Sequence, residues 1–292
     1  MNKWNTSVMM VINRYLAQWM IVLAVCIGLT LTSRAEEPSN RPFGMVKIND
    51  TLYMDETEVS VGMWLAFYNW TLKHETLDAA NALLPDSSAI EPAIWTFIQR
   101  SCMEFDIAIR LKQSKTELDI VKVSDLKTYL GYYQTSKLSK DESALLDVAI
   151  TGINHKQVMK FCKWRSTLFT TTNYAYRLAN LQEWTGIATY VLTANKNDTL
   201  FKGKYPLFNY NNQLVEKWPA FKTAIQPNGM FPGNNLGLDN FFGNVSEMVM
   251  DEGKAVGGNY NLYAWQCQPD NVQIYTKPRL WLGFRCIYTT SQ

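Results

Sequence analysis

The order of apolar and polar residues along the chain predicts short strands and amphipathic helices, separated by long polar segments. Phe43 to Met54 is strand-like and is interrupted by the turn signal Asn49-Asp50. Tyr174 to Leu178 has the same strand-like character. Glu247 to Met250 is predicted to be a buried strand that follows a glycine-containing turn.

Three helices are predicted from apolar spacing that follows residues typical of helix N-termini. Ser60 is suited to be the N-cap of a helix in which aromatic residues recur at helical spacing. Asn154 with Gln157, and Asn180 with Glu183, form the capping-box pattern at two further helices. The residues expected on the apolar faces of these helices are Trp64, Phe67, Tyr68, Val158, Phe161, Cys162, Leu181, Trp184, Ile187, Ala188 and Val191.

Two longer segments follow no simple pattern. Within about residues 74–147, Thr96 to Leu111 and Val123 to Tyr133 are predicted to be helical, whereas the charged stretch Lys137 to Glu142 predicts a solvated face or a loop. Asn195 to Pro232 is rich in Asn, Lys, Gly and Pro and has little periodicity. Long loops of this kind in compact domains are usually functional or held by ions and packing.

The N-terminus, residues 1–35, predicts an export signal. Lys3 and Arg14 supply positive charge before an apolar run, and Ser33-Arg34-Ala35 fits a small-x-small cleavage site. The run, Trp19 to Leu29, is short for a membrane span of about 20 residues. An uncleaved anchor and a lipid on Cys26 are the alternatives. We therefore expect a protein of the periplasm or outer membrane, associated with a membrane only if it is lipidated or keeps its signal.

Composition and charge mainly exclude classes of protein and of partner. Hydrophobic residues make up 47% of the 292 positions and charged residues 18%, so the chain can build a core and is not disordered in character. The net charge of +2, without a basic run among aromatic residues, predicts no nucleic-acid partner. His74 and His155 are the only histidines and share no motif, so they do not suggest an iron site.

Four cysteines follow the predicted signal: Cys102, Cys162, Cys267 and Cys286. In an exported protein they could form disulfides, and four cysteines allow three connectivities. None of them belongs to a Cys-x-x-Cys motif or to a Cys/His cluster, so the spacing gives no support for a zinc site.

One turn, Asn-x-x-Gly-Asn-Val-x-Glu, concentrates oxygen atoms that suit calcium. The side-chain oxygen of Asn240, the backbone carbonyls near Gly243 and Val245, and the Glu247 carboxylate are hard ligands, unsuited to zinc or copper. We therefore expect a structural calcium ion here. The alternative is a plain glycine turn in which the Asn and Glu side chains bond to backbone.

Several motifs occur in a recognisable order: Thr151-Gly152-Ile153-Asn154, Tyr176 to Trp184, the turn from Asn240 to Glu247, Val256-Gly257-Gly258-Asn259-Tyr260, and Leu282 to Cys286. Together they resemble the formylglycine-generating enzyme, or sulfatase-modifying factor, family. The resemblance covers about residues 43–287, with residues 74–147 as an unmatched, mainly helical insert. It implies one α+β domain over residues 36–292, related to C-type lectins, with short strands, few helices and long loops. It also implies a disulfide between Cys162 and Cys286.

The resemblance fails at the chemistry of the catalytic members, which hold copper between two cysteines placed after the Gly-Gly pair. The matching positions here are Leu262 and Cys267, so one thiolate is missing and we do not expect copper. Three aromatic residues nearby are suited to a binding surface or to the core: Tyr260, Tyr263 and Trp265.

We therefore expect an exported, non-oxidase member that acts as a binding or assembly component at the gram-negative envelope. The resemblance to the gliding-motility and type IX secretion lipoproteins of this family suggests a role in secretion or gliding. Its partner would be an envelope or secretion-apparatus protein, or a peptide or glycan ligand. The alternatives are a formylglycine-generating type of enzyme with altered chemistry at Cys267, and a lectin-like ligand binder.

Overall fold

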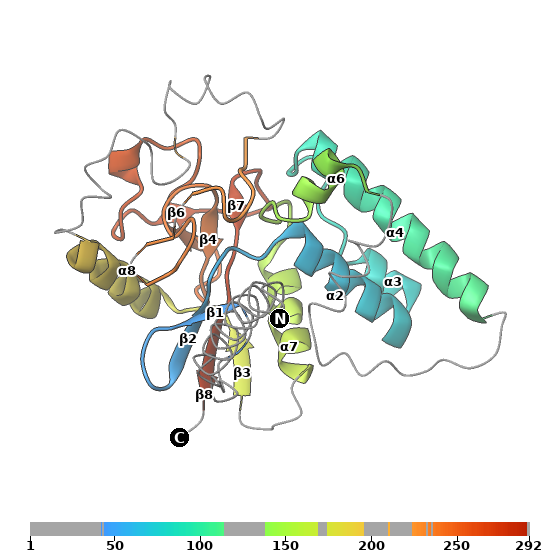
Figure 1. Cartoon of the computed structure of the whole chain (residues 1–292), viewed down its shortest axis with the longest axis horizontal. Helices are drawn as coiled ribbons and strands as arrows, with labels where there is room; N and C mark the ends of the chain where they lie inside the picture. The colour runs from blue at the N-terminus through green and yellow to red at the C-terminus, as the bar shows by residue number, and fades with distance from the viewer. Residues whose placement is uncertain are drawn as a thin grey trace, which may run out of the picture. The chain divides into compact units, whose positions relative to one another are not determined.

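The computed structural model describes residues 44–113, 138–168, 174–195, 224–231 and 236–290, together with positions 42, 210, 233 and 234. All helices and strands in these ranges belong to one compact unit, Phe43–Gln292 (Figure 1). They comprise two four-stranded sheets and six α-helices, which confirms the expected α+β class. None of these helices combines the length and apolarity that a membrane crossing requires.

The first sheet joins the two ends of the compact unit. Its order is β1 (Met45–Lys47), β2 (Leu52–Asp55), β8 (Ile287–Thr290) and β3 (Tyr174–Arg177), and all neighbours are antiparallel. The strands predicted within Phe43 to Met54 and within Tyr174 to Leu178 are therefore confirmed. The Oδ1 atom of Asn49 accepts the backbone N–H groups of Thr51 and Leu52, which forms the expected turn between β1 and β2.

The second sheet is built from shorter strands late in the chain. Its order is β6 (Gln273–Ile274), β5 (Lys254–Val256), β4 (Ser246–Met248) and β7 (Leu282–Gly283). The β4–β7 pair is parallel, and the other two pairs are antiparallel. The buried strand predicted for Glu247 to Met250 is therefore present, although it begins at Ser246 and ends at Met248.

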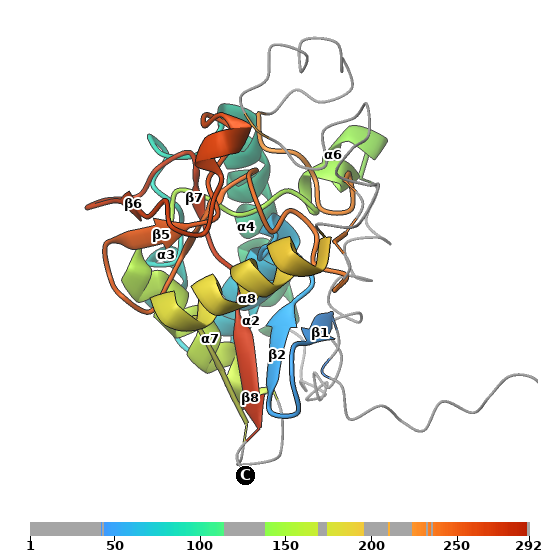
Figure 2. The same cartoon turned by 90° about the vertical axis from the view of Figure 1, so that its left-hand side faces the viewer.

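The three capped helices are present as predicted. Ser60 accepts the backbone N–H of Met63 at the start of α2 (Val61–His74). Asn154 and Gln157 form a reciprocal capping box at α7 (His155–Thr167). The same two bonds link Asn180 and Glu183 at α8 (Leu181–Asn195). In Figure 2, α8 crosses the near face of the molecule, in front of β2 and β8.

The insert is helical in the part that the structure describes. It contains α3 (Leu77–Asn81), α4 (Pro92–Gln113) and α6 (Lys140–Leu145). The predicted helix from Thr96 to Leu111 is confirmed within α4, whereas Val123 to Tyr133 lies outside the described residues. For the charged stretch Lys137 to Glu142, the prediction of a loop is wrong from Lys140 onward. A capping box between Ser139 and Glu142 starts α6 at that residue.

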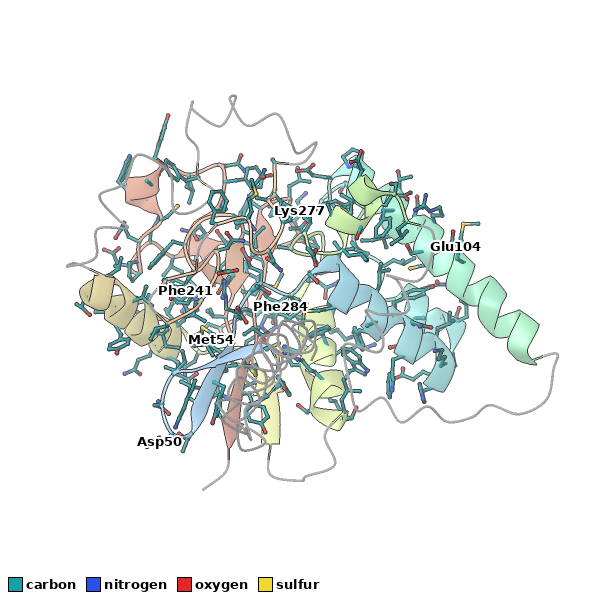
Figure 3. All side chains as sticks on the ribbon, in the orientation of Figure 1. Asp50, Met54, Glu104, Phe241, Lys277 and Phe284 are labelled. Carbon is teal, nitrogen blue, oxygen red and sulfur yellow. The ribbon has the colours of Figure 1, made fainter. Side chains whose placement is uncertain are left out.

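The interior contains two hydrophobic clusters, and the insert shares the first of them. In that cluster Trp64 stacks on Phe161 with ring centroids 5.6 Å apart, and Phe284 packs edge-on against both rings. The insert contributes Ile94, Phe97, Ile98 and Cys102 to it. The second cluster centres on Trp184, stacked on Phe241 at 4.8 Å. Figure 3 shows Phe241 and Phe284 toward the middle of the molecule, with Asp50 and Glu104 at its edges.

Candidate functional site

The turn before β4 is tightly wound and buried. Asn240, Gly243 and Asn244 have φ angles of 47°, 76° and 52°, in the left-handed region that glycine and asparagine tolerate best. The N–H of Gly243 donates to the carbonyl of Gly257 at 2.8 Å, which joins this turn to the Gly-Gly pair. The turn predicted from the sequence is therefore confirmed, and it positions Glu247 on the strand that follows.

Glu247 is buried with both carboxylate oxygens in use. Its Oε1 accepts from Nε of Arg285 at 2.5 Å, and its Oε2 accepts from Nε1 of Trp184 at 2.9 Å. Burial raises the pKa of Glu247, and the nearby Arg285 charge opposes that rise. Arg285 neutralises the carboxylate and both of its oxygens accept hydrogen bonds, so the free-energy cost of burying this charge is offset.

Glu58 is a buried carboxylate to which the sequence analysis gave no role. Its Oε1 accepts from Nδ2 of Asn244 at 3.0 Å, and its Oε2 accepts from Nδ2 of Asn240 at 3.2 Å. Burial is the main reason that the pKa of Glu58 rises to about 7; Arg285 lowers it and Glu247 raises it. The signal for it in the sequence is Glu58-Val59-Ser60, which places this carboxylate two residues before the N-cap of a largely buried helix.

The predicted calcium ligands lie together, but their chemistry only partly fits the ion. The Oδ1 atom of Asn240 is buried and has no hydrogen-bond partner among the described residues, which is expected of an atom that binds a cation. Glu247, the one carboxylate of the set with Asn240, Gly243 and Val245, is already neutralised by Arg285. The described part of the chain also holds no cluster of three or more His, Cys, Asp or Glu suited to a metal. Glu247 therefore does not fit as a free ligand, and calcium binding stays a prediction.

Cys267, which the resemblance in sequence matches to one cysteine of the family, lies against Gly258. A Cβ atom on Gly258 would lie 2.5 Å from Sγ of Cys267, so only glycine allows this approach. Burial raises the pKa of the Cys267 thiol to about 11, while a backbone hydrogen bond from Asn259 opposes that rise. The side chain is therefore a thiol rather than a thiolate near neutral pH.

The residues near Cys267 do not fit a copper(I) centre of the family type. Leu262, which the resemblance in sequence matches to the second cysteine, packs against the hydrophobic cluster that contains Cys267. A hydrocarbon side chain offers no electron pair to a metal, and Cys267 alone is a single buried thiol. No step in the chemistry of this chain can therefore be assigned to such a centre.

The three predicted surface aromatics divide into two groups. Tyr263 and Trp265 are 54% and 72% exposed, and their rings are stacked at 6.4 Å with an interplanar angle of 8°. They flank the start of the short 3-10 helix η3 (Ala264–Gln266). Tyr260 is instead half-buried against the first hydrophobic cluster, and its N–H donates to the carbonyl of Asn244. Of these three residues, Tyr263 and Trp265 therefore present their rings to solvent.

Cys162 and Cys286 meet in the core although 124 positions separate them in the chain. Their sulfur atoms are 3.6 Å apart, longer than a disulfide bond of about 2.05 Å, so the structure holds them as neighbouring thiols. The N–H of Cys286 and the guanidinium of Arg165 both donate to Oδ2 of Asp55. The Cys162–Cys286 disulfide stays a prediction, which this proximity supports. Cys102 and Cys267 belong to different hydrophobic clusters.

The family model of the sulfatase-modifying factor enzyme 1-like domain matches residues 20–290. The chain therefore belongs to this family. The match spans the insert and extends into the segment that we predict to be an export signal. No curated protein sequence matches the chain.

Solved structures with a measurable likeness include PvdO from Pseudomonas aeruginosa, at 16% identity and a TM-score of 0.38. That alignment covers 49% of this chain and 63% of PvdO, so the chain spans less than two thirds of that protein. The crystal structure of CarF aligns at 19% identity and a TM-score of 0.38, over 52% of this chain and 72% of CarF. Variable protein 1 of Treponema denticola aligns at 11% identity and a TM-score of 0.42, over 85% and 91%. Likenesses at this level carry no argument about activity or partner.

Proposed function

We propose that this protein is a non-oxidase member of its family that serves as an exported binding or assembly component at the gram-negative envelope, in protein secretion or gliding. The observation that carries the proposal is the surroundings of Cys267. It is a lone buried thiol, its pKa is raised to about 11, and Leu262 occupies the place of a second cysteine. A linear copper(I) site needs two thiolate ligands, and the Leu262 side chain cannot supply one of them.

The exposed pair of Tyr263 and Trp265 supports a binding role. Large aromatic side chains provide much contact area at a small cost in side-chain entropy. The backbone beneath the pair is well supported, because the N–H of Tyr263 donates to Oε1 of Gln266 and Asn271 donates to the Gln266 carbonyl. A partner of suitable chemistry is an envelope protein, or a peptide or glycan that stacks against the rings.

The proposal includes a C-type-lectin-like architecture, supported by two small sheets joined by long connections. The export part rests on the sequence of residues 1–35. A second candidate is an enzyme of the formylglycine-generating type with altered chemistry at Cys267, the one cysteine that the sequence matches to the family pair. A lectin-like ligand binder is the third candidate, and it would use the same exposed rings.

An oxidase assay tests the central part of the proposal. The mature protein is titrated with copper(I) and assayed for oxidation of a Cys-x-Pro-x-Arg peptide, and we expect no turnover. Leu262→Cys is the informative variant, because it restores the second thiol and should raise copper(I) affinity above that of the unmodified protein. Turnover of the peptide by the unmodified protein would overturn the proposal in favour of the enzyme.

Site-specific photo-crosslinking in cells tests the binding surface. A photoreactive phenylalanine derivative replaces Tyr263 in one variant and Tyr190 in a matched control, since these tyrosines are 54% and 56% exposed. We expect an adduct with an envelope component from position 263 and none from position 190. Equal adducts from both positions, or none from either, would contradict a specific surface at Tyr263.

A further inference from the structure

A cavity of about 220 Å³ is lined by residues of α2, α3 and α7, and α2 lies beside each of the other two helices in Figure 1. Its lining contains no residue of the turn from Asn240 to Glu247, and neither Cys267 nor the pair of Tyr263 and Trp265. The cavity is therefore separate from the site described above.

Aromatic rings form a large part of its wall. Phe67 and Trp70 come from α2, and Trp164 comes from α7. The rings of Phe67 and Trp164 contact each other with centroids 5.0 Å apart, and Trp70 stacks on His74 at 4.7 Å. Because each ring is held by a second ring, this wall is a fixed apolar surface suited to a flat or compact apolar group.

Two side chains in the wall have polar atoms that lack partners. Nε1 of Trp164 and Oγ1 of Thr71 are buried and make no hydrogen bond to any described residue. The two side chains belong to residues that are only 4% and 3% exposed. Buried indole N–H groups and hydroxyls nearly always find a partner, so each such exception calls for an explanation. Both atoms are closed to a water-sized probe, so they are polar atoms within the wall rather than open groups on its surface.

Positive charge lies at the exposed end of the lining. Lys160 and Lys163 are three positions apart on α7, so they share one face of the helix. Both are exposed, and neither forms an ion pair with any described residue. Glu75 is the single carboxylate among the lining residues, so the cationic charge exceeds the anionic charge.

We propose that this cavity binds a small cyclic organic acid. Its apolar ring would pack against Phe67, Trp70 and Trp164, and its carboxylate would lie at Lys160 and Lys163. The volume of 220 Å³ is below the ~300–1,000 Å³ of sites for drug-sized ligands, which limits the ligand to about one ring.

Binding can be followed at Trp164 itself, with 4-hydroxybenzoate as the probe. The mature protein is labelled with 15N-tryptophan, and Trp164→Phe identifies the Trp164 indole signal among those of the eight tryptophans that follow residue 35. We expect 4-hydroxybenzoate to shift this signal in a saturable way. The doubly substituted Lys160→Gln, Lys163→Gln variant should raise the Kd about fivefold or more, because two cations are lost at a partly solvated site.

The controls distinguish the contribution of the ligand's charge from that of its apolar ring and from nonspecific binding. Lys156→Gln removes an exposed lysine of α7 that does not line the cavity, and it should leave the Kd unchanged. The neutral 4-hydroxybenzamide should bind the unmodified protein and the double variant alike. An unmoved Trp164 signal, or equal Kd values for 4-hydroxybenzoate in the unmodified protein and the double variant, would overturn the proposal. So would inorganic phosphate if it shifted Trp164 as strongly, since no apolar body would then be needed.

Discussion

Nε of Arg285 donates to Oε1 of Glu247 over 2.5 Å, and the two side chains are 1% and 2% exposed. The other guanidinium nitrogens donate to the backbone carbonyls of Asp55, Glu56, Asp239 and Asn240. One arginine near the C-terminus therefore holds β2, the turn before β4, and β4 itself in a single hydrogen-bonded unit.

Removal of the Glu247 carboxylate should be strongly destabilising. Glu247→Ala leaves the Arg285 charge and the Trp184 N–H buried without this acceptor, so we expect the free energy of unfolding to fall by about 3–5 kcal/mol. Urea denaturation measures the loss. Asp50→Ala, which breaks the exposed Lys47–Asp50 pair, is the control and should change little. Equal losses in the two variants would contradict the role given to the Arg285 unit.

The stability of the protein should fall as the pH rises from about 4.5 to about 7. Folding raises the pKa of Glu58 from its usual 4.5 to about 7, so the folded state binds a proton more tightly than the unfolded state. The resulting stabilisation is fully present below pH 4.5 and is lost as the pH rises through 7. A shift of this size corresponds to about 3 kcal/mol.

Glu58→Gln isolates that contribution. Glutamine cannot ionise, so the difference in unfolding free energy between Glu58→Gln and the unmodified protein should change by about 3 kcal/mol between pH 4.5 and pH 7. Urea denaturation at a series of pH values measures it. A difference that stays constant across this range would show that Glu58 does not titrate there.

Gly258→Ala should destabilise the protein through its contact with Cys267. The added Cβ would lie 2.5 Å from Sγ and 2.8 Å from Cα of that residue, and Gly258 has a φ of +75°. Strain and overpacking of this kind each cost about 1–3 kcal/mol. Gly229→Ala is a matched control, because Gly229 has a φ of +77° with nothing within 4 Å of the added atom. The excess loss in Gly258→Ala measures the contact, and equal losses would show that only the backbone angle matters.

The thiols of Cys162 and Cys286 should oxidise to a disulfide in the exported protein. Their 3.6 Å separation requires only a small movement to form the bond. The loop of 124 positions predicts a stabilisation of about 4–5 kcal/mol in the chain-entropy model, which is an upper value. Peptide mapping without reductant identifies the linked peptides. Recovery of both cysteines alkylated, from protein isolated from the envelope, would contradict the prediction.

Calcium binding at the Asn240 turn should be weak. Glu247 is already paired with Arg285, so we expect a Kd on the order of millimolar. Millimolar calcium should then raise the melting temperature of the unmodified protein by mass action, and should not do so in Asn240→Ala, which removes the unpartnered Oδ1 atom. Identical melting curves in calcium and in excess chelator would rule the ion out.

Local structure was the part of this protein that the sequence determined. Ser60, Asn154 and Asn180 each bond to a backbone N–H three residues further along, so a short pattern contains the whole interaction. The glycine turn before β4 was predictable for the same reason. The charge of Lys137 to Glu142 favours a solvated segment, but the capping box between Ser139 and Glu142 is an equally local pattern and starts a helix there.

Only the tertiary structure decided which distant side chains share an environment. Glu58 accepts hydrogen bonds from Asn240 and Asn244, which are 182 and 186 positions away. Lys160 reaches the cavity beside Thr71 only because α7 packs near α2. Such encounters depend on how whole helices and sheets pack around the core, and that packing sums many small contacts. A motif of a few residues can specify its own hydrogen bonds, but it contains no information about which distant segment will face it.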